Sequence, residues 1–480
     1  MIAPDTKWGC AAGIVLTALF FSPLAGVPND QRLFLFWRHG DSIDLIVACI
    51  AMSLAIGFVV SWSLRSKHRH LAALLICGIW FIPLTCLTAS VVRLLPGVRW
   101  LLAPTPVAMG LAFMIAMLAA AIIKHPLRVT RLALDILPVC VPATVVVGAF
   151  LVSLMMARSV STTFGTIGPE GSHARGPNIL VLVFDELSYN YLFDGTSVGR
   201  HYPAFHAAAL RGVSYTQAKS PGGRTLLSLP GYLAGKRFAR AEVAGGLMYV
   251  ADSPGGPLVA LEAQLEDGPC RQARAAGYRT EISGYYLPYC DLLKSEVDAC
   301  RTISEYNSNW IGAPRSVWSP IWTNLSLLPH QFPTGLIKNP IYSYHQKAMT
   351  AAIIADAQAP FTGSDKVFRF IHLSIPHAPF VYDRDGFRLR GDPFVTTNEA
   401  YADQLRYTDT VLAGILNAHA SALDNTRVVI TADHELRANT APEENDHVPL
   451  FVLRTSQPAA ATVDEPTWVS DVVRQVISSR

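Results

Sequence analysis

Carboxylate and imidazole side chains follow directly after three apolar runs in the second half of the sequence. These side chains are Asp185, Glu186, His377, Asp433 and His434. Carboxylates are costly to bury unless a cation or hydrogen bonds compensate them, and Asp with His suits a zinc- or manganese-type ion. Each position also has an ordinary interpretation, because an acid can cap the next helix and a lone histidine is more often a core or surface residue. Three such positions together predict a site for one divalent metal ion.

The three apolar runs read as core strands. Residues 179–184, 366–375 and 426–432 are apolar with few breaks and are bounded by polar or turn residues, which is typical of strands buried on both faces of a parallel sheet. In such sheets ligands bind just beyond the carboxyl ends of the strands. We therefore expect the acids and histidines to meet at one edge of one sheet.

A hydroxyl group in the segment GRTLLSLP is the candidate nucleophile. The turn at Pro221-Gly222-Gly223 precedes Thr225, which would open a helix. A helix N-terminus favours a phosphoryl group, although Thr225 taken alone is more often an ordinary N-cap. Beside a metal ion, the hydroxyl would have a lowered pKa and could attack a phosphoryl or sulfuryl group. A nearby histidine would protonate the leaving oxygen or steady the acceptor.

The composition points to a membrane protein. Of 480 residues, 51% are hydrophobic and 16% charged, and the mean hydropathy is +0.29, which is too apolar for an ordinary soluble protein. No basic cluster or nucleic-acid-binding motif is present, so we expect no nucleic-acid partner. Five apolar segments reach the ~20 residues that a membrane-spanning helix needs. They are Trp8–Val27, Ser42–Leu64, Leu71–Val92, Trp100–Ile123 and Leu132–Met156.

The basic residues predict the orientation of these segments. Lys and Arg are more frequent at the N-terminus and in the second and fourth joins than in the first and third, so the N-terminus should lie inside and everything after Met156 outside. The first segment could instead be a cleaved signal peptide. We predict a transmembrane region over 1–157, a Gly-rich linker over 158–176 and an outer domain over 177–480.

Three of the eight cysteines lie in the predicted outer domain. An extracytoplasmic compartment is oxidising, so we expect a disulfide between Cys290 and Cys300, which flank a short helical stretch, with Cys270 free. The sequence alone does not fix this pairing. Residues 301–345 are rich in Trp, Pro and Asn and read either as a substrate-facing insertion or as a packed loop.

With these motifs in place, the sequence resembles the alkaline phosphatase/sulfatase superfamily, and above all its membrane-anchored branch of lipoteichoic acid synthases and phosphoethanolamine transferases. The resemblance covers essentially the whole chain, with motifs spread over residues 177–453. It implies an N-terminal five-helix transmembrane bundle followed by an α/β/α sandwich domain of the alkaline phosphatase type, with a mostly parallel sheet.

The resemblance also assigns roles to residues. NILVLVFDE is similar to the family's first strand, whose acid binds the metal, here Asp185. GRTLLSLP is similar to the segment with the nucleophilic, metal-binding threonine, here Thr225, and TADHE to the metal pair, here Asp433 and His434. The substrate-binding positions fall on Glu186, on His377 in PHAPF and on His447 in HVPLFV.

Two departures from the family pattern matter. Glu435 follows the Asp-His pair where the family usually has glycine, so Glu435 could contact the site. True sulfatases convert a Cys or Ser to formylglycine, which Thr225 cannot become, and this argues against sulfate-ester hydrolysis.

The resemblance therefore implies a multi-pass enzyme of the bacterial inner membrane with a periplasmic or extracellular catalytic domain. It would move a phospholipid head group, of the phosphoethanolamine or glycerophosphate type, through a covalent phospho-threonine at Thr225 to an envelope glycan or lipid. One alternative is a sulfatase-like hydrolase, either a phosphodiesterase or a sulfuric ester hydrolase, with water as acceptor. Another is a non-catalytic membrane scaffold.

Overall fold

The computed structural model describes residues 4–21, 41–65, 126–157, 163–164, 176–244, 247–293, 296–303, 318, 321, 335–361, 365–390, 392–395, 397–437, 445–454 and 460–479. The chain divides into two compact units. One comprises Met1–Ser159 with Gly312–Lys338, and the other comprises Val160–Ile311 with Asn339–Arg480.

The first unit contains three described helices, α1 (Pro4–Phe21), α2 (Asp41–Arg65) and α5 (Pro126–Ala157). Among the described residues only Ser42–Arg65 is long and apolar enough to cross a membrane, while Thr6–Phe21 and Pro138–Phe150 are shorter apolar stretches. The predicted spans over 71–92 and 100–123 lie outside the described residues.

Helices α1 and α2 approach each other closely through glycines. A Cβ atom added at Gly13 would lie 2.1 Å from the carbonyl oxygen of Ser53, and one added at Gly9 would lie 1.9 Å from Oγ of Ser61. Glycines four residues apart let two helix backbones come together, as is common between membrane helices. The contact therefore depends on the absence of side chains on this face of α1.

We expect Gly13→Ala to loosen this contact, because the new methyl group must displace the backbone of Ser53. Overpacking of this kind costs about 1–3 kcal/mol. The matched control is Gly148→Ala in α5, where an added Cβ meets nothing within 4 Å. Heat denaturation of the full chain in detergent should show a lower midpoint for Gly13→Ala alone. Equal midpoints would contradict the close approach of the two helices.

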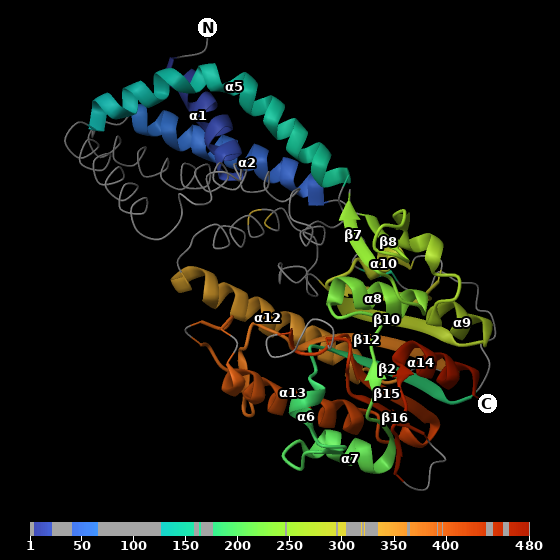
Figure 1. Cartoon of the computed structure of the whole chain (residues 1–480). Coiled ribbons are helices and arrows are strands. Elements are labelled where there is room, and N and C mark those ends of the chain that lie inside the picture. Colours follow the sequence, from blue (N-terminus) through green and yellow to red (C-terminus); the bar gives the residue numbers. More distant parts are fainter. Residues whose placement is uncertain are drawn as a thin grey trace. The chain divides into compact units, whose positions relative to one another are not determined.

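The second unit is built on a nine-stranded sheet (Figure 1). In spatial order its strands are β1 (Thr163–Phe164), β11 (Ala299–Ile303), β10 (Arg279–Tyr285), β12 (Val367–Pro376), β2 (Asn178–Asp185), β15 (Thr426–Ala432), β16 (Leu450–Leu453), β5 (Gly212–Tyr215) and β17 (Ala461–Val463). The run from β11 to β15 is parallel throughout, which confirms the predicted mostly parallel sheet. Strand β1 falls within the stretch 158–176 that we expected to be a linker, since Thr163 and Phe164 pair with β11.

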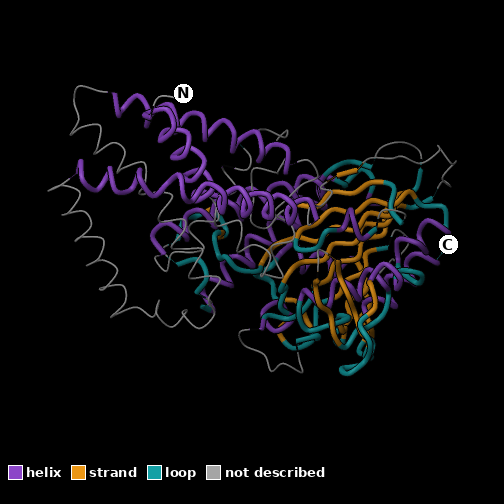
Figure 2. The backbone as a smooth tube through the Cα atoms, turned by 90° about the horizontal axis from the view of Figure 1, so that it is seen from above, coloured by secondary structure: helices purple, strands orange, loops and turns teal. Residues whose placement is uncertain are grey.

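Helices cover both faces of this sheet (Figures 1 and 2). One group is α7 (Pro203–Arg211), α12 (Gly335–Gln358) and α13 (Asn398–Ala418), and the other is α8 (Thr225–Ala234), α9 (Pro269–Ala275) and α14 (Val469–Ser478). The shorter helices are α6 (Tyr189–Leu192) and α10 (Tyr289–Leu292), with 3₁₀ turns at Leu261–Gln264 and Leu423–Asn425.

Four small sheets complete this unit. They pair β3 (Phe193–Asp194) with β4 (Ser197–Val198), β6 (Ala218–Lys219) with β18 (Thr467–Trp468), β13 (Tyr382–Asp383) with β14 (Gly386–Phe387), and β8 (Leu247–Ala251) with both β7 (Arg240–Ala244) and β9 (Val259–Ala260).

Register brings three strand ends together. Strand β15 pairs with β2 without a shift as far as Ala432, which lies opposite Phe184, so Asp433 emerges beside Asp185. On the other side of β2, the register of β12 shifts after Leu373, and Pro376 then pairs with Asp185. Such an irregularity bends a strand where its pairing ends. The residues after β2, β12 and β15 therefore lie at one edge of the sheet, as expected.

Candidate active site

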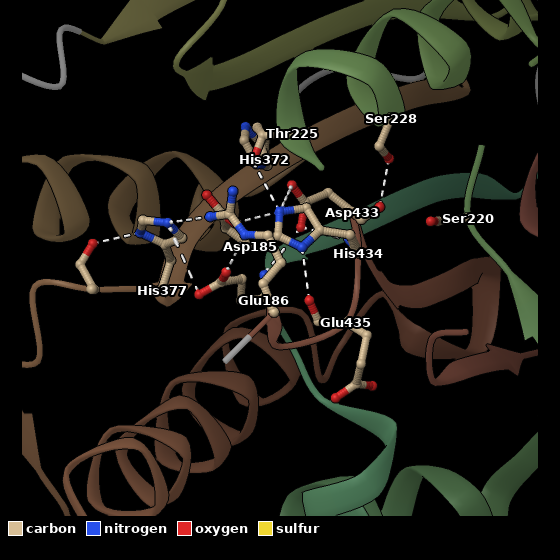
Figure 3. Close-up of polar contacts among 12 residues, drawn as sticks. Asp185, Glu186, Ser220, Thr225, Ser228, His372, His377, Asp433, His434 and Glu435 are labelled. Carbon is tan, nitrogen blue, oxygen red and sulfur yellow. Dashed lines mark hydrogen bonds and ion pairs between the residues drawn. The ribbon is translucent and has the colours of Figure 1, made fainter. Parts of the chain in front are cut away.

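Asp185, Asp433 and His434 form a buried group at this edge. Each offers one ligand atom, and these atoms lie within 4.8 Å of one another. Nε2 of His434 is 3.7 Å from Oδ1 of Asp185 and 3.4 Å from Oδ2 of Asp433. All three residues are at most 2% exposed, and Figure 3 shows their side chains turned toward one another.

Hydrogen bonds hold this group in place but leave one of its buried carboxylate oxygens without a donor in the described part of the chain. Oδ1 of Asp433 accepts the backbone N–H of Glu186 at 3.0 Å and that of His434 at 2.8 Å. Oδ2 of Asp433 is buried and accepts no hydrogen bond from any described residue. Nδ1 of His434 lies 2.8 Å from the carbonyl oxygen of Glu435. Because a carbonyl only accepts, Nδ1 donates this hydrogen bond, and Nε2 is the ring nitrogen that faces the two carboxylates.

Two buried carboxylates directed at one point repel each other unless a cation lies between them. The donor set therefore fits one divalent metal ion with Asp185, Asp433 and His434 as ligands. A bond from Nδ1 to a carbonyl is the usual way in which a metal-binding histidine is oriented.

Thr225 is held against this group by one face of helix α8. Its Oγ1 lies 3.1 Å from Nε2 of His434, and the residue is 6% exposed. On the same helix face, Ser228 donates to the carbonyl of Asp433 at 2.5 Å and Tyr232 donates to that of Ala432 at 2.7 Å. Three hydroxyl groups at helical spacing thus tie α8 to the end of β15, and Thr225 is the first residue of the helix.

Glu186 lies outside the group formed by Asp185, Asp433 and His434 and turns toward His377 (Figure 3). Its Oε1 accepts Nε of Arg437 at 2.8 Å, and its Oε2 lies 3.9 Å from Nε2 of His377. Burial opposes ionisation of the Glu186 carboxyl, but its neighbours His377, His434 and Arg437 lower its pKa. Its backbone has φ of 59°, a strained value of the kind that clusters at functional sites.

His377 lies in a loop between two prolines. The peptide bonds Ile375–Pro376 and Ala378–Pro379 are cis. Nδ1 of His377 donates to the carbonyl of Ala378, which leaves Nε2 facing Glu186 and Arg437. Sequence reasoning overlooked Arg437, and its only signal is a basic residue three positions after His434.

Glu435 and His447 do not enter the metal group. Figure 3 shows the Glu435 carboxylate pointing away from Asp185 and Asp433. Its Oε2 accepts the backbone N–H of Tyr189 at 2.6 Å, and burial raises the pKa of Glu435 to about 7. Nε2 of His447 lies 2.8 Å from the carbonyl oxygen of Thr216, to which it donates, and its ring packs 4.2 Å from that of Tyr189.

The cysteines of this unit lie outside the group just described. Cys290 and Cys300 are joined by a disulfide between α10 and β11, and Cys270 is a buried free thiol.

Comparison with known proteins identifies the family. The family model for sulfatases matches residues 177–478. This chain belongs to the sulfatase family. It is therefore an enzyme of the alkaline phosphatase/sulfatase superfamily, a hydrolase or transferase, and the enzymes of that superfamily are metal-dependent.

Solved structures with some similarity cover the same part of this sulfatase-family chain. A phosphonate monoester hydrolase of Agrobacterium radiobacter is 15% identical with a TM-score of 0.40, covering 62% of this chain and 72% of that one. A protein in the alkaline phosphatase superfamily from Vibrio parahaemolyticus is 14% identical with a TM-score of 0.37, covering 66% and 68%. A 2-O GAG sulfatase is 12% identical with a TM-score of 0.41, covering 64% and 71%. No curated protein matches the sequence.

A wall of aromatic rings supports Asp185 in this sulfatase-family site. The Tyr285 hydroxyl donates to Oδ2 of Asp185. The ring of Tyr285 stacks on that of His372 at 4.7 Å, and Nδ1 of His372 is 3.1 Å from the hydroxyl of Tyr289. Burial lowers the pKa of His372 to about 4, so this ring is neutral. Sequence reasoning missed Tyr285, although it stands at the end of a core strand, β10, as the metal ligands do.

We expect Tyr285→Phe to weaken metal binding by about 10- to 100-fold, the usual effect of removing a group that orients a ligand. The control is Tyr289→Phe, which removes a hydroxyl from the same wall but leaves Asp185 untouched and should change the affinity by less than about threefold. Calorimetric titration of Mn²⁺ or Zn²⁺ into the metal-free full chain measures both. Unchanged affinity in Tyr285→Phe would show that the hydroxyl does not orient Asp185.

Gln404 of α13 holds the loop around His377 through hydrogen bonds to its backbone. It is fully buried. Its Nε2 donates to the carbonyls of Pro376 and His377, at 3.0 and 2.7 Å. Its Oε1 accepts the backbone N–H groups of Val381 and Tyr382, at 2.8 and 3.1 Å. One amide thus satisfies four backbone groups around His377.

Gln404→Leu should leave these four backbone groups without partners, each at a cost of about 1–3 kcal/mol. We expect hydrogen exchange at Val381 and Tyr382 to accelerate by at least about tenfold, and turnover to fall because His377 is no longer held. Gln272→Leu is the control, since its Nε2 bonds only Asp267. Equal exchange rates in the two variants would mean that Gln404 does not order this loop.

Proposed function

We propose that this enzyme is a membrane-bound, metal-dependent phosphotransferase. The observation that carries the proposal is Thr225, a buried hydroxyl at the start of α8 whose Oγ1 lies 3.1 Å from Nε2 of His434. A threonine in this position can act as a nucleophile without conversion to formylglycine. This favours a phosphodiester substrate over a sulfate ester.

Asp185, Asp433 and His434 would hold one divalent ion, zinc or manganese, with Thr225 beside it. When bound, the ion would lower the pKa of the Thr225 hydroxyl and neutralise charge on the phosphoryl oxygens. The chain itself supplies the orientation, because the hydroxyls of Ser228 and Tyr232 fix α8 on the strand end.

In the proposed reaction, Oγ1 of Thr225 gives up its proton and forms a bond to phosphorus of a phospholipid head group. The bond from phosphorus to the diacylglycerol oxygen breaks, and this oxygen takes up a proton and leaves as a hydroxyl group. The phosphorylated head group, of the phosphoethanolamine or glycerophosphate type, remains on Thr225. An acceptor hydroxyl of an envelope glycan or lipid then takes the group and releases Thr225. His377, whose Nε2 faces the site, is proposed to protonate the leaving oxygen or to steady the acceptor hydroxyl. Glu186 and His447 are the other proposed substrate-binding residues.

An apolar helix in the first unit supports the choice of a phospholipid as donor. Helix α2 is long and apolar enough to span a bilayer, and Leu54 and Phe58 on it are 69% and 70% exposed. We propose that it is one of five spans in a bacterial inner membrane, with the catalytic domain on the outer side. The disulfide between Cys290 and Cys300 suits an oxidising compartment. We also propose that the stretch 301–345 shapes the acceptor site; its residues 304–317, 319–320 and 322–334 lie outside the described part of the chain.

The competing function is hydrolysis, with water as the acceptor, as the family's name suggests. Both reactions begin with the same attack by Thr225, so they differ only in the second step. Release of the head group in the absence of any acceptor would favour the hydrolase. Release that requires an added glycan or lipid would favour the transferase.

The mass of the peptide containing Thr225, purified from native membranes, tests the shared first step. We expect an added phosphoethanolamine, glycerophosphate or phosphate group, and its mass identifies the donor. Thr225→Ala should lack the adduct and lose turnover by about 10³-fold or more, as expected for a nucleophile. Thr225→Ser, which keeps a hydroxyl, should retain part of the activity.

Thr410→Ala serves as the control, because Thr410 is on the exposed side of α13 and its hydroxyl bonds only the carbonyl of Arg406. It should carry the adduct and turn over as the wild type does. Activity retained in Thr225→Ala would overturn the mechanism.

A further inference from the structure

Two neighbours, Glu186 and His377, hold the side chain of Arg437 beside the metal group. Its Nε donates to Oε1 of Glu186 at 2.8 Å, and its Nη2 donates to Nε2 of His377 at 3.3 Å. Its side chain is 45% exposed, whereas that of Glu186 is 7% exposed. The guanidinium group is thus anchored on a buried carboxylate and a partly exposed imidazole, and it is itself partly exposed to solvent.

The two anchors leave part of this guanidinium available. Arginine has five N–H donors in a fixed planar fork, and within the described chain its hydrogen bonds run only from Nε and Nη2. No described residue accepts a hydrogen bond from Nη1, which carries two protons. A fork held on one side and open on the other suits the binding of a tetrahedral oxyanion.

The charge around Arg437 points to the same chemistry. Burial alone would lower the pKa of Arg437, but Glu186, Asp185 and Asp433 raise it. The guanidinium group therefore interacts electrostatically with both carboxylates of the metal group. A divalent ion and Arg437 together would balance the three carboxylates. The site would then carry no net charge before the substrate binds. A singly charged phosphodiester would leave one excess negative charge, whereas a doubly charged phosphate monoester would leave two.

The backbone conformation of Glu186 keeps its carboxylate against Arg437. Its left-handed conformation is unfavourable for a residue other than glycine, and two hydrogen bonds maintain it. The Glu186 N–H donates to Asp433, and its carbonyl accepts the hydroxyl of Tyr401 at 2.6 Å. The strained turn directs the carboxylate of Glu186 away from Asp185 and onto Arg437.

We propose that Arg437 is the anion-recognising residue of the site. It binds a non-bridging oxygen of the singly charged phosphoryl group, while Glu186 and His377 position it. This inference rests on the proposed function for the identity of the substrate group. Glu186 then contributes to substrate binding through Arg437, which it holds in place.

The test uses the full chain in detergent, loaded with Mn²⁺, with inorganic phosphate as the anion probe. Two affinities are measured by calorimetry in each variant, that of phosphate for the Mn²⁺-loaded chain and that of Mn²⁺ for the metal-free chain. In Arg437→Gln we expect phosphate to bind about 10- to 100-fold more weakly, the usual effect of losing a charge-assisted hydrogen bond. Mn²⁺ should bind equally or more tightly, because a positive charge near its ligands has been removed.

Further variants separate recognition from structure. Arg437→Lys keeps the charge but loses the planar fork, so it should recover only part of the phosphate affinity. Glu186→Gln should weaken phosphate binding through the released guanidinium. The control is Arg406→Gln, since Arg406 is also 45% exposed and pairs with an acid, Asp403, at 3.0 Å. It should change neither affinity.

Two results would overturn the inference. One is phosphate binding that is absent from the wild type or unchanged in Arg437→Gln. The other is a parallel loss of phosphate and Mn²⁺ affinity, which would show that Arg437 only stabilises the loop. Phosphate binding that depends on Arg437, in a chain whose Thr225 never carries an adduct, would uphold the anion site and refute the transferase.

Discussion

Two carboxylates, those of Asp185 and Asp433, are buried at the ends of adjacent parallel strands, and the rest of the site depends on compensating them. Taking an ionised carboxylate out of water costs several kcal/mol. Part of this cost is offset by the backbone N–H groups of Glu186 and His434 and by the Tyr285 hydroxyl. The remainder calls for a cation, and Nε2 of His434 faces the same point. The requirement for a metal thus follows from strand register, since an unshifted pairing of β2 and β15 brings the acids together.

The nucleophile is positioned by the same strand ends. Helix α8 begins at Thr225 and is bonded through Ser228 and Tyr232 to the last residues of β15. A movement of β15 would therefore carry the metal ligands and the nucleophile together. On the other side of β2, Gln404 fixes the His377 loop to α13, and Pro376 at the start of this loop pairs with Asp185. The site consists of a rigid half on β15 and α8 and a separately supported half around His377.

Much of this architecture could be predicted, because it depends on local sequence. The apolar run of β2 predicts a core strand, and the rule that ligands bind at the carboxyl ends of parallel strands selects Asp185, Asp433 and His377. The mostly parallel sheet follows from the same pattern. The contacts of Tyr285 and Gln404 could not be predicted, since they join segments 100 and 28 residues apart whose proximity depends on register. Arg437 was overlooked because an isolated arginine after a metal motif has no distinctive local signal. The strand at Thr163 and Phe164 could not be predicted either, because two residues are too few to show a period.

Glu435 shows why a departure from a family pattern needs a structure. The resemblance implies glycine at this position, and a glycine could supply the carbonyl that orients His434. It could not supply the carboxylate that accepts the Tyr189 N–H. The Tyr189 ring in turn packs on His447, whose Nε2 donates to Thr216. The acid therefore connects the metal-binding loop to the segment that holds His447. Glu435 contributes to the site through this connection and not as a ligand, because its carboxylate is directed away from the metal group.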